Sequence, residues 1–149
     1  MTTMNKVYTK EVWPQAFQAM LNFSKTVTPV AIQPQQAELL KIRVSQINRC
    51  AYCLDLHITT ARRLGESQQR LDILAAWRST DLFTPEEKAI LCKAEQLTLL
   101  DRNPVGEDFG YQLTAGQEKE VVMLTAVINS WNRIMHGIGP EINQSAGAI

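Results

Sequence analysis

The stretch Thr84-Pro85-Glu86-Glu87 contains the clearest helix start in this sequence. Thr84 can cap the first turn with its hydroxyl oxygen, Pro85 suits the first helical position, and Glu87 can complete a capping box at the third. Apolar residues then recur at helical spacing, so we expect the helix to continue to about Asp101.

The rest of the chain repeats this helical pattern, and no segment shows the sustained two-residue alternation of a β-strand. Pro34 suits the first position of another helix, whose apolar residues recur every three or four positions: Ala37, Leu40, Val44 and Ile47. We expect four further helices, over Thr9–Thr26, Asn48–Leu64, Gln68–Trp77 and Thr114–His136.

The helix ends carry their own signals. Thr9 and Asn48 are candidate N-caps, Pro14 lies near the first turn of its helix, and Gly65 fits a C-terminal stop. In the last helix we expect one buried stripe, formed by Val121, Leu124, Thr125, Ile128, Trp131 and Met135. Two segments lie outside the predicted helices: the long loop Arg102–Tyr111, and the tail Gly137–Ile149, which we expect to be frayed or covered by a partner.

Composition narrows the class of protein. The 149 residues, 45% hydrophobic and 20% charged, suit one globular domain, residues 1–149, of the all-α class. Lys plus Arg number 15 and Asp plus Glu also 15, so the chain lacks the overall positive charge that favours nucleic acid.

Sequence features also bear on location. No apolar run approaches the roughly 20 residues of a membrane span, so we expect no membrane insertion. Met1–Tyr8 lacks the apolar core of a signal peptide, and three cysteines are too few for a secreted disulfide framework. We therefore expect a cytoplasmic protein.

One cluster carries chemistry: Cys50-Ala51-Tyr52-Cys53-Leu54-Asp55-Leu56-His57. On a helix, steps of three and four residues place Cys50, Cys53 and His57 on one face. Two cysteines at this spacing can close and reopen a short disulfide, and a histidine one turn away can accept the thiol proton or stabilise the thiolate. The cluster therefore favours redox chemistry over two buried structural cysteines beside a surface histidine.

The cluster does not decide which cysteine attacks a substrate. With Asn48 as N-cap, Cys50 lies in the first turn, where the helix dipole favours a thiolate. Cys53, however, is nearer to His57 along the chain. We expect Cys53 to attack a peroxide and Cys50 to resolve the product, and the reverse assignment stays open.

Zinc is the main competing ligand for these side chains. Cys50 and His57 are seven residues apart, which separates them by roughly 10.5 Å along a helix. That is too far for both to bind one ion, unless Cys50 lies off the helix, and the chain has no second pair of cysteines or histidines. Covalent haem is disfavoured because Leu54, not histidine, follows Cys53.

The segment from Glu38 to His57 resembles the core motif of the alkylhydroperoxidase D-like, or carboxymuconolactone decarboxylase, family. The resemblance continues through three more segments, 61–65, 75–78 and 129–133. It implies an all-helical fold, assembly into a homo-trimer or homo-hexamer, and reduction of hydroperoxides by the cysteine pair. The implied catalytic residues are Cys53, Cys50, His57 and Glu38.

The resemblance assigns Glu38 a role that its position alone does not suggest, because a carboxylate bonded to His57 would orient the ring and raise its basicity. It implies no cofactor, but an external dithiol reductant, which is lipoyl-type in the best-known family member. The decarboxylase branch lacks the cysteine pair, which argues against lactone decarboxylation here. Two alternatives stay open: a redox-sensing or zinc-binding interaction module, and a cofactor-free decarboxylase or isomerase that uses Glu38 and His57.

Other candidate residues have simpler interpretations. We expect Cys92 to be a buried small hydrophobe and His136 to have a structural role at a helix end. Tyr52 points away from the face of the cysteines and is a candidate cover for the site. Trp131 fits the core stripe, whereas the following Asn132 and Arg133 have no role that the sequence decides.

Overall fold

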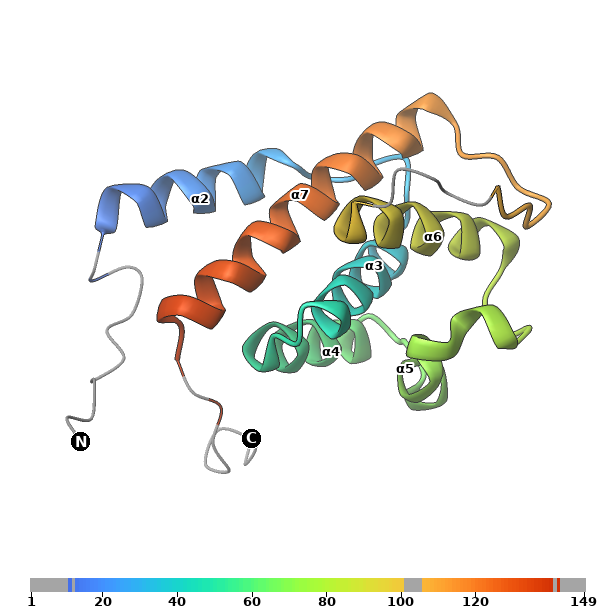
Figure 1. Ribbon diagram of the computed structural model, residues 1–149, viewed down its shortest axis with the longest axis horizontal. Coiled ribbons are helices and arrows are strands. Elements are labelled where there is room, and N and C mark those ends of the chain that lie inside the picture. The colour runs from blue at the N-terminus through green and yellow to red at the C-terminus, as the bar shows by residue number, and fades with distance from the viewer. Residues whose placement is uncertain (1–10, 12, 101–105, 141, 143–149) are drawn as a thin grey trace.

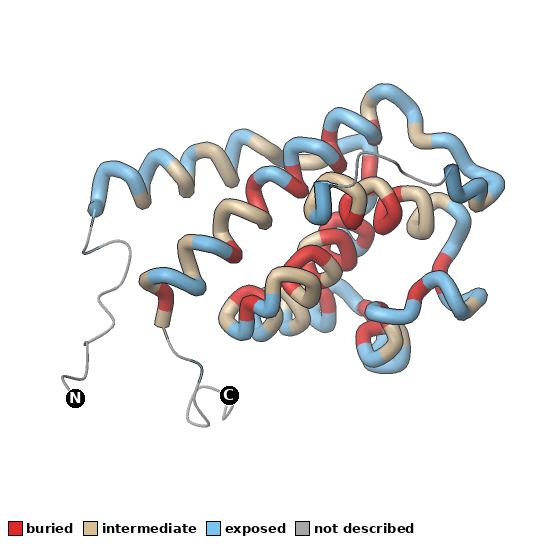
Figure 2. Tube along the Cα trace, in the orientation of Figure 1, coloured by how far each residue is buried: buried red, intermediate tan, exposed pale blue. Residues whose placement is uncertain are grey.

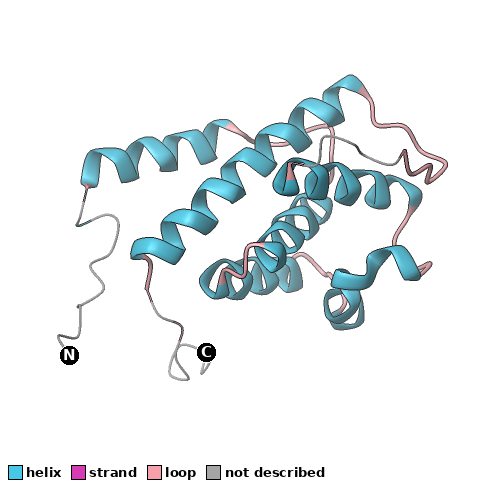
Figure 3. Cartoon of the chain, in the orientation of Figure 1, coloured by secondary structure: helices cyan, strands magenta, loops and turns pink. Residues whose placement is uncertain are grey.

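The computed structural model describes residues 11, 13–100, 106–140 and 142, and this part consists of helices and loops (Figure 3). The all-α prediction is therefore confirmed for the described residues. The helices are α2 (Pro14–Thr26), α3 (Pro34–Ile47), α4 (Ala51–Arg63), α5 (Gln68–Ile73), the 3₁₀-helix η1 (Leu74–Ser79), α6 (Pro85–Leu99) and α7 (Ala115–Ile138). No helix in this part of the chain combines the length and apolar character of a membrane span.

Helix α3 lies at the centre of the fold, in contact with α4, α6 and α7 (Figure 1). Its apolar residues Leu40 and Val44 face α7 and the cysteines, and Leu39 and Ile42 face a second cluster around Trp77. Buried residues accordingly concentrate on α3 and on the helix faces turned toward it (Figure 2). α3 thus divides the core into two parts, of which one carries the cysteine pair.

Local signals explain where several helices begin. Thr84 and Glu87 form the expected capping box of α6, and Gln117 caps α7 with Thr114 in the same way. Pro34 occupies the start of α3 as predicted, where Gln33 and Gln36 form a further capping box. Gly65 has φ +93°, a left-handed conformation that favours glycine, which confirms it as the stop after α4.

The predicted helix over Asn48–Leu64 begins too early. Asn48 is the C-cap of α3 rather than an N-cap, and Arg49 adopts a left-handed conformation with φ +56°. This break moves the start of the next helix to Ala51 and makes Cys50 its N-cap. Cys50 therefore lies just outside the helical face that Cys53 and His57 share, because the left-handed residue delays the start of the second helix.

Other predicted boundaries also shift. Of the helix expected over Thr9–Thr26, α2 begins at Pro14, and Thr9 lies outside the described residues. The helix expected over Gln68–Trp77 becomes α5 followed by η1, with Ala76 at the non-helical φ of −112°. α6 ends at Leu99 because Leu100 is left-handed. α7 continues to Ile138, so the tail expected from Gly137 begins later, and most of it lies outside the described residues.

A buried carboxylate fixes the connection between α2 and α3. Both oxygens of Glu120 accept hydrogen bonds, at 2.8 to 3.0 Å, from the backbone N–H groups of residues 30–32. Burial raises the pKa of Glu120, but these N–H groups outweigh it and hold the pKa below its ordinary value. α2 then lies along α7 (Figure 1), where Phe17 meets the ring of Trp131 edge to face at 5.7 Å.

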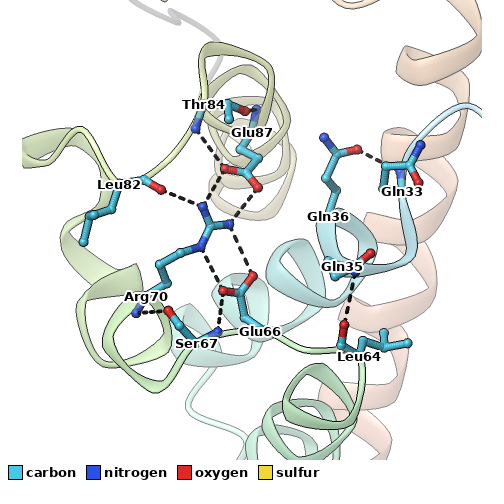
Figure 4. A network of polar contacts seen from close by, with 10 residues as sticks. All are labelled: Gln33, Gln35, Gln36, Leu64, Glu66, Ser67, Arg70, Leu82, Thr84 and Glu87. Carbon is cyan, nitrogen blue, oxygen red and sulfur yellow. Dashed lines mark hydrogen bonds and ion pairs between the residues drawn. The ribbon is translucent and has the colours of Figure 1, made fainter.

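A second charged cluster joins α5 to α6 through Arg70 (Figure 4). Its guanidinium donates to Glu66 at 2.8 Å, to Glu87 at 2.7 Å and to the carbonyl of Leu82 at 2.6 Å. It also lies 4.7 Å from the centre of the Phe83 ring. We call Arg70, Glu66 and Glu87 the Arg70 cluster.

Candidate active site

Cys50 and Cys53 are joined as a disulfide at the start of α4, with their Cα atoms 5.3 Å apart. Both residues are only 2% exposed. The Cys50 sulfur accepts a hydrogen bond from the backbone N–H of Cys53 at 3.3 Å. In the reduced state, the same N–H group and the helix dipole would stabilise a thiolate at Cys50.

A hydrogen bond between Glu38 and His57 links α3 to α4 beside this pair. The Glu38 Oε2 atom lies 2.8 Å from the His57 Nδ1 atom, and Lys41 Nζ lies 2.8 Å from the other carboxylate oxygen. Burial raises the pKa of Glu38, but the bond to His57 and the charge of Lys41 outweigh it, so the pKa lies below its ordinary value. The carboxylate therefore stays ionised and holds the imidazole ring by Nδ1, which leaves Nε2 for another partner.

Cys53 and His57 line the same cavity of about 290 Å³, which we call the Cys53 cavity. Lys41 and Tyr52 also border it, and most of its remaining wall is apolar and comes from α2 and α7: Phe17, Leu21, Val27, Leu124, Val127, Ile128, Trp131 and Met135. The contribution of α2 to this wall was not predicted from the sequence. Phe17 and Leu21 are four residues apart and so share one face of α2, but nothing local shows what that face covers.

Cys50 borders a separate space of about 270 Å³, which we call the Cys50 hollow. Its wall includes Arg49 and His136, and both of these side chains are exposed. Tyr52 and Met135 line both spaces and thus stand between them. The two cysteines therefore border spaces of different character, one largely apolar and the other partly polar.

A polar network from α7 holds the turn that precedes Cys50. The side chain of Asn132 is fully buried, donates to Ser45 Oγ at 3.0 Å and accepts from Asn48 Nδ2 at 2.9 Å. His136 Nε2 lies 2.8 Å from the carbonyl oxygen of Asn48. Asn132, which the sequence left without a role, thus fixes the backbone beside the left-handed Arg49.

The structure brings Cys50, Cys53, His57 and Glu38 together, although Cys50 enters from the turn and not from the helical face. Cys92 lies apart from them in the second core cluster and is buried, as expected. Burial and the nearby charge of Glu107 raise the pKa of its thiol, which disfavours the reactive thiolate. Within the described residues, no group of three or more His, Cys, Asp or Glu side chains is arranged to hold a metal ion.

Fold and site together define a class: all-helical domains with a Cys-x-x-Cys pair at a helix start and a Glu–His pair beside it. The model of the carboxymuconolactone decarboxylase family matches residues 14–96. The chain belongs to this family, as the resemblance in the sequence indicated.

Two relatives extend the comparison. The chain is 37% identical over 133 residues to the uncharacterized protein YdfG of Bacillus subtilis (strain 168), and the match covers 87% of this chain and 90% of YdfG. It is also similar to the crystal structure of a protein of unknown function from Agrobacterium tumefaciens, suggested to be the antioxidant defence protein AhpD. The TM-score is 0.83 at 25% identity, and the match covers 93% of this chain and 97% of the other.

Proposed function

We propose that the protein is a dithiol-dependent peroxidase that reduces hydroperoxides through Cys53 and Cys50, with His57 and Glu38 assisting. The observation that carries this proposal is the shared cavity of Cys53 and His57, beside a partner cysteine at disulfide distance. The similarity to a structure suggested to be AhpD supports it. The proposal requires a reduced pair, a peroxide and a thiol reductant, and it calls for no cofactor.

In the first step the Cys53 thiolate attacks the terminal oxygen of the hydroperoxide. The O–O bond breaks, the alcohol leaves, and Cys53 becomes a sulfenic acid. His57, held at Nδ1 by Glu38, takes the thiol proton before the attack and returns it to the leaving oxygen. The apolar wall of the Cys53 cavity favours an organic group on the peroxide.

In the second step the Cys50 thiolate attacks the Cys53 sulfur. A disulfide forms, and the sulfenic hydroxyl leaves as hydroxide, which takes a proton from solvent and becomes water. The hydrogen bond from the Cys53 N–H to the Cys50 sulfur supports Cys50 as a stabilised thiolate in this role. An external dithiol then reduces the disulfide by two thiol–disulfide exchanges and is itself oxidised to a disulfide.

The direct test follows hydroperoxide consumption with excess dithiol in the native chain and in the Cys53→Ser and Cys50→Ser variants. We expect many turnovers per site in the native chain and none in either variant. A single fast oxidation should survive in Cys50→Ser, because Cys53 is still present, and should be lost in Cys53→Ser. If Cys53→Ser keeps the full rate of this first oxidation, the two cysteines have the opposite roles.

A second candidate function uses only the Glu38–His57 pair. His57 of this pair borders a cavity in a chain of the decarboxylase family, so acid–base chemistry without the cysteines is the main competitor. The same two variants separate the candidates, since a decarboxylase or isomerase would keep its activity in both. No peroxide turnover, with both thiols still free after peroxide exposure, would favour this second function.

We also propose that the chain assembles as a homo-trimer or homo-hexamer. Exposed apolar side chains at the end of α6 and on α7 support association: Leu99, Leu100 and Val122 are 64%, 77% and 38% exposed. Sedimentation velocity at micromolar concentration should show the trimer or hexamer. A monomer alone under these conditions would contradict this proposal and leave the peroxidase proposal unaffected.

A further inference from the structure

The two cysteines of the redox pair border different spaces, which suggests that the peroxide and the reductant enter by different routes. The Cys53 cavity is largely apolar and is bordered by His57, the partner of Glu38. The Cys50 hollow is not bordered by His57 but includes Arg49 and His136 at its wall. Tyr52 lies between the two cysteines in sequence and borders both spaces.

The oxidised enzyme must be reached by a thiol, although each cysteine is only 2% exposed. A reductant therefore has to enter one of the two spaces. In the Cys53 cavity it would compete with the peroxide and with the leaving alcohol for the same apolar wall. The Cys50 hollow gives a route to the other sulfur that leaves the peroxide cavity free.

We propose that the Cys50 hollow is the docking site of the thiol reductant, and that it favours a thiol that carries a carboxylate or another anionic group. The inference rests on the proposed function, whose reductant it characterises. Arg49 is exposed, borders the hollow next to Cys50 in the chain and brings a permanent positive charge to its wall. Its φ of +56° is uncommon for a residue other than glycine, and the Asn132 network holds the adjoining turn in place.

The reductant reduces the Cys50–Cys53 disulfide in two thiol–disulfide exchanges. The reductant thiolate attacks the Cys50 sulfur, the disulfide breaks, and Cys53 leaves as a thiolate beside His57. A second thiol then attacks the mixed disulfide and releases Cys50 as a thiolate at the helix start, where the Cys53 N–H stabilises it. The two electrons come from the two thiols, which end as one disulfide.

The charge preference is tested on the oxidised protein without any peroxide. Three small thiols of similar size serve as probes: 2-mercaptoethanesulfonate, 2-mercaptoethanol and cysteamine, which are anionic, neutral and cationic. Disulfide loss is followed by alkylation and mass spectrometry in the native chain and in Arg49→Asn, since asparagine tolerates left-handed backbone. The mutant-to-native rate ratio for each thiol cancels its intrinsic reactivity.

We expect Arg49→Asn to slow the anionic thiol about fivefold, to leave the neutral thiol within about twofold, and to speed the cationic thiol. Arg63→Asn removes the same charge from the far end of α4 and should change none of the three ratios. Equal ratios for all three thiols in Arg49→Asn would overturn the charge preference.

The route is tested by narrowing each space in turn. Ala51 borders the Cys50 hollow and Leu56 borders the Cys53 cavity, and both are exposed. We expect Ala51→Trp to slow reduction by thiols more than oxidation by peroxide, and Leu56→Trp to do the reverse. If Leu56→Trp is the variant that slows reduction, the inference is wrong. Because reduction is measured without peroxide, this outcome is independent of whether the peroxidase proposal holds.

Discussion

The pair Glu38–His57 and the Arg70 cluster both bury carboxylates between helices, but they differ in what they leave available. In the Arg70 cluster the guanidinium is surrounded by acceptors: two carboxylates and one backbone carbonyl. Burial lowers the pKa of Arg70, but its bonds to Glu87 and Glu66 outweigh this effect and raise the pKa. All N–H donors of the guanidinium are engaged, so none is left to bind a substrate. The cluster therefore serves to join α5 to α6.

The Glu38 carboxylate is also fully engaged, but one of its partners is an imidazole at the wall of a cavity. Nδ1 of His57 is committed to Glu38, whereas Nε2 is left to exchange a proton, and the residue borders the Cys53 cavity. Burial and pairing alone therefore do not mark a functional site. On the proposed function, what distinguishes the Glu38–His57 pair is a partner at a cavity wall that can still exchange a proton.

The largest effect that this contrast predicts is on catalysis. Glu38→Gln should lower kcat/KM for a hydroperoxide about 10²–10³-fold, because the ring of His57 loses its orienting negative charge. Its free energy of unfolding should fall by only about 1 kcal/mol, since the glutamine keeps the shape. Steady-state peroxide consumption and urea unfolding measure the two quantities. The same substitution at Glu66 is the matched control and should leave kcat/KM within about twofold. If Glu38→Gln and Glu66→Gln lose activity equally, the Glu38–His57 pair and the Arg70 cluster do not differ in function.

The next largest effect is on stability. Arg70→Leu leaves the buried carboxylate of Glu66 and the half-buried carboxylate of Glu87 without their cation, so we expect a loss of about 3 kcal/mol in the free energy of unfolding. The folded fraction should reduce peroxide at the native rate, because the cluster does not border the Cys53 cavity. Urea unfolding followed by circular dichroism gives the first quantity, and peroxide assays well below the unfolding midpoint give the second. If the Arg70→Leu variant is as stable as the native chain, the Arg70 cluster does not contribute to stability.

The sequence predicted those features that depend on local chemistry. The capping box at Thr84, the proline at the start of α3 and the left-handed Gly65 all follow from neighbouring residues alone. The juxtaposition of Cys53 and His57 follows from the helical repeat, and both line one cavity. These features were predictable because a single turn of helix contains all of the interacting groups.

Features that depend on contacts between distant segments were not predictable from the residues. The N-cap role of Cys50 depends on the left-handed conformation of Arg49. Arginine does not favour this conformation, so the residue itself gives no signal of a turn. The turn is held by Asn132, which is 84 positions from Asn48. The contact of Glu38 with His57 also joins two helices, and only the family resemblance indicated it. Such contacts are encoded by packing and leave no local pattern.

The smallest expected effect concerns acid stability and the origin of the Glu38 charge. The pKa of Glu38 lies below its ordinary value of 4.5 in the folded protein, because the bond to His57 and the charge of Lys41 outweigh burial. As the pH falls, the unfolded chain therefore binds this proton first. The resulting stabilisation is complete above about pH 4.5 and is lost as the pH falls through the folded-state pKa.

Glu38→Gln should therefore lose less stability than the native chain between neutral pH and about pH 3.5, as measured by urea unfolding at both values. The acid sensitivity should become weaker without disappearing, because Glu95 and Glu120 also have lowered pKa values and remain in the variant. For Glu95, bonds from Arg43, Arg78 and Trp77 outweigh the effect of burial. An acid dependence that is identical in the variant and the native chain would mean that the charge of Glu38 does not stabilise the fold. Its ionised state would then serve only to hold His57.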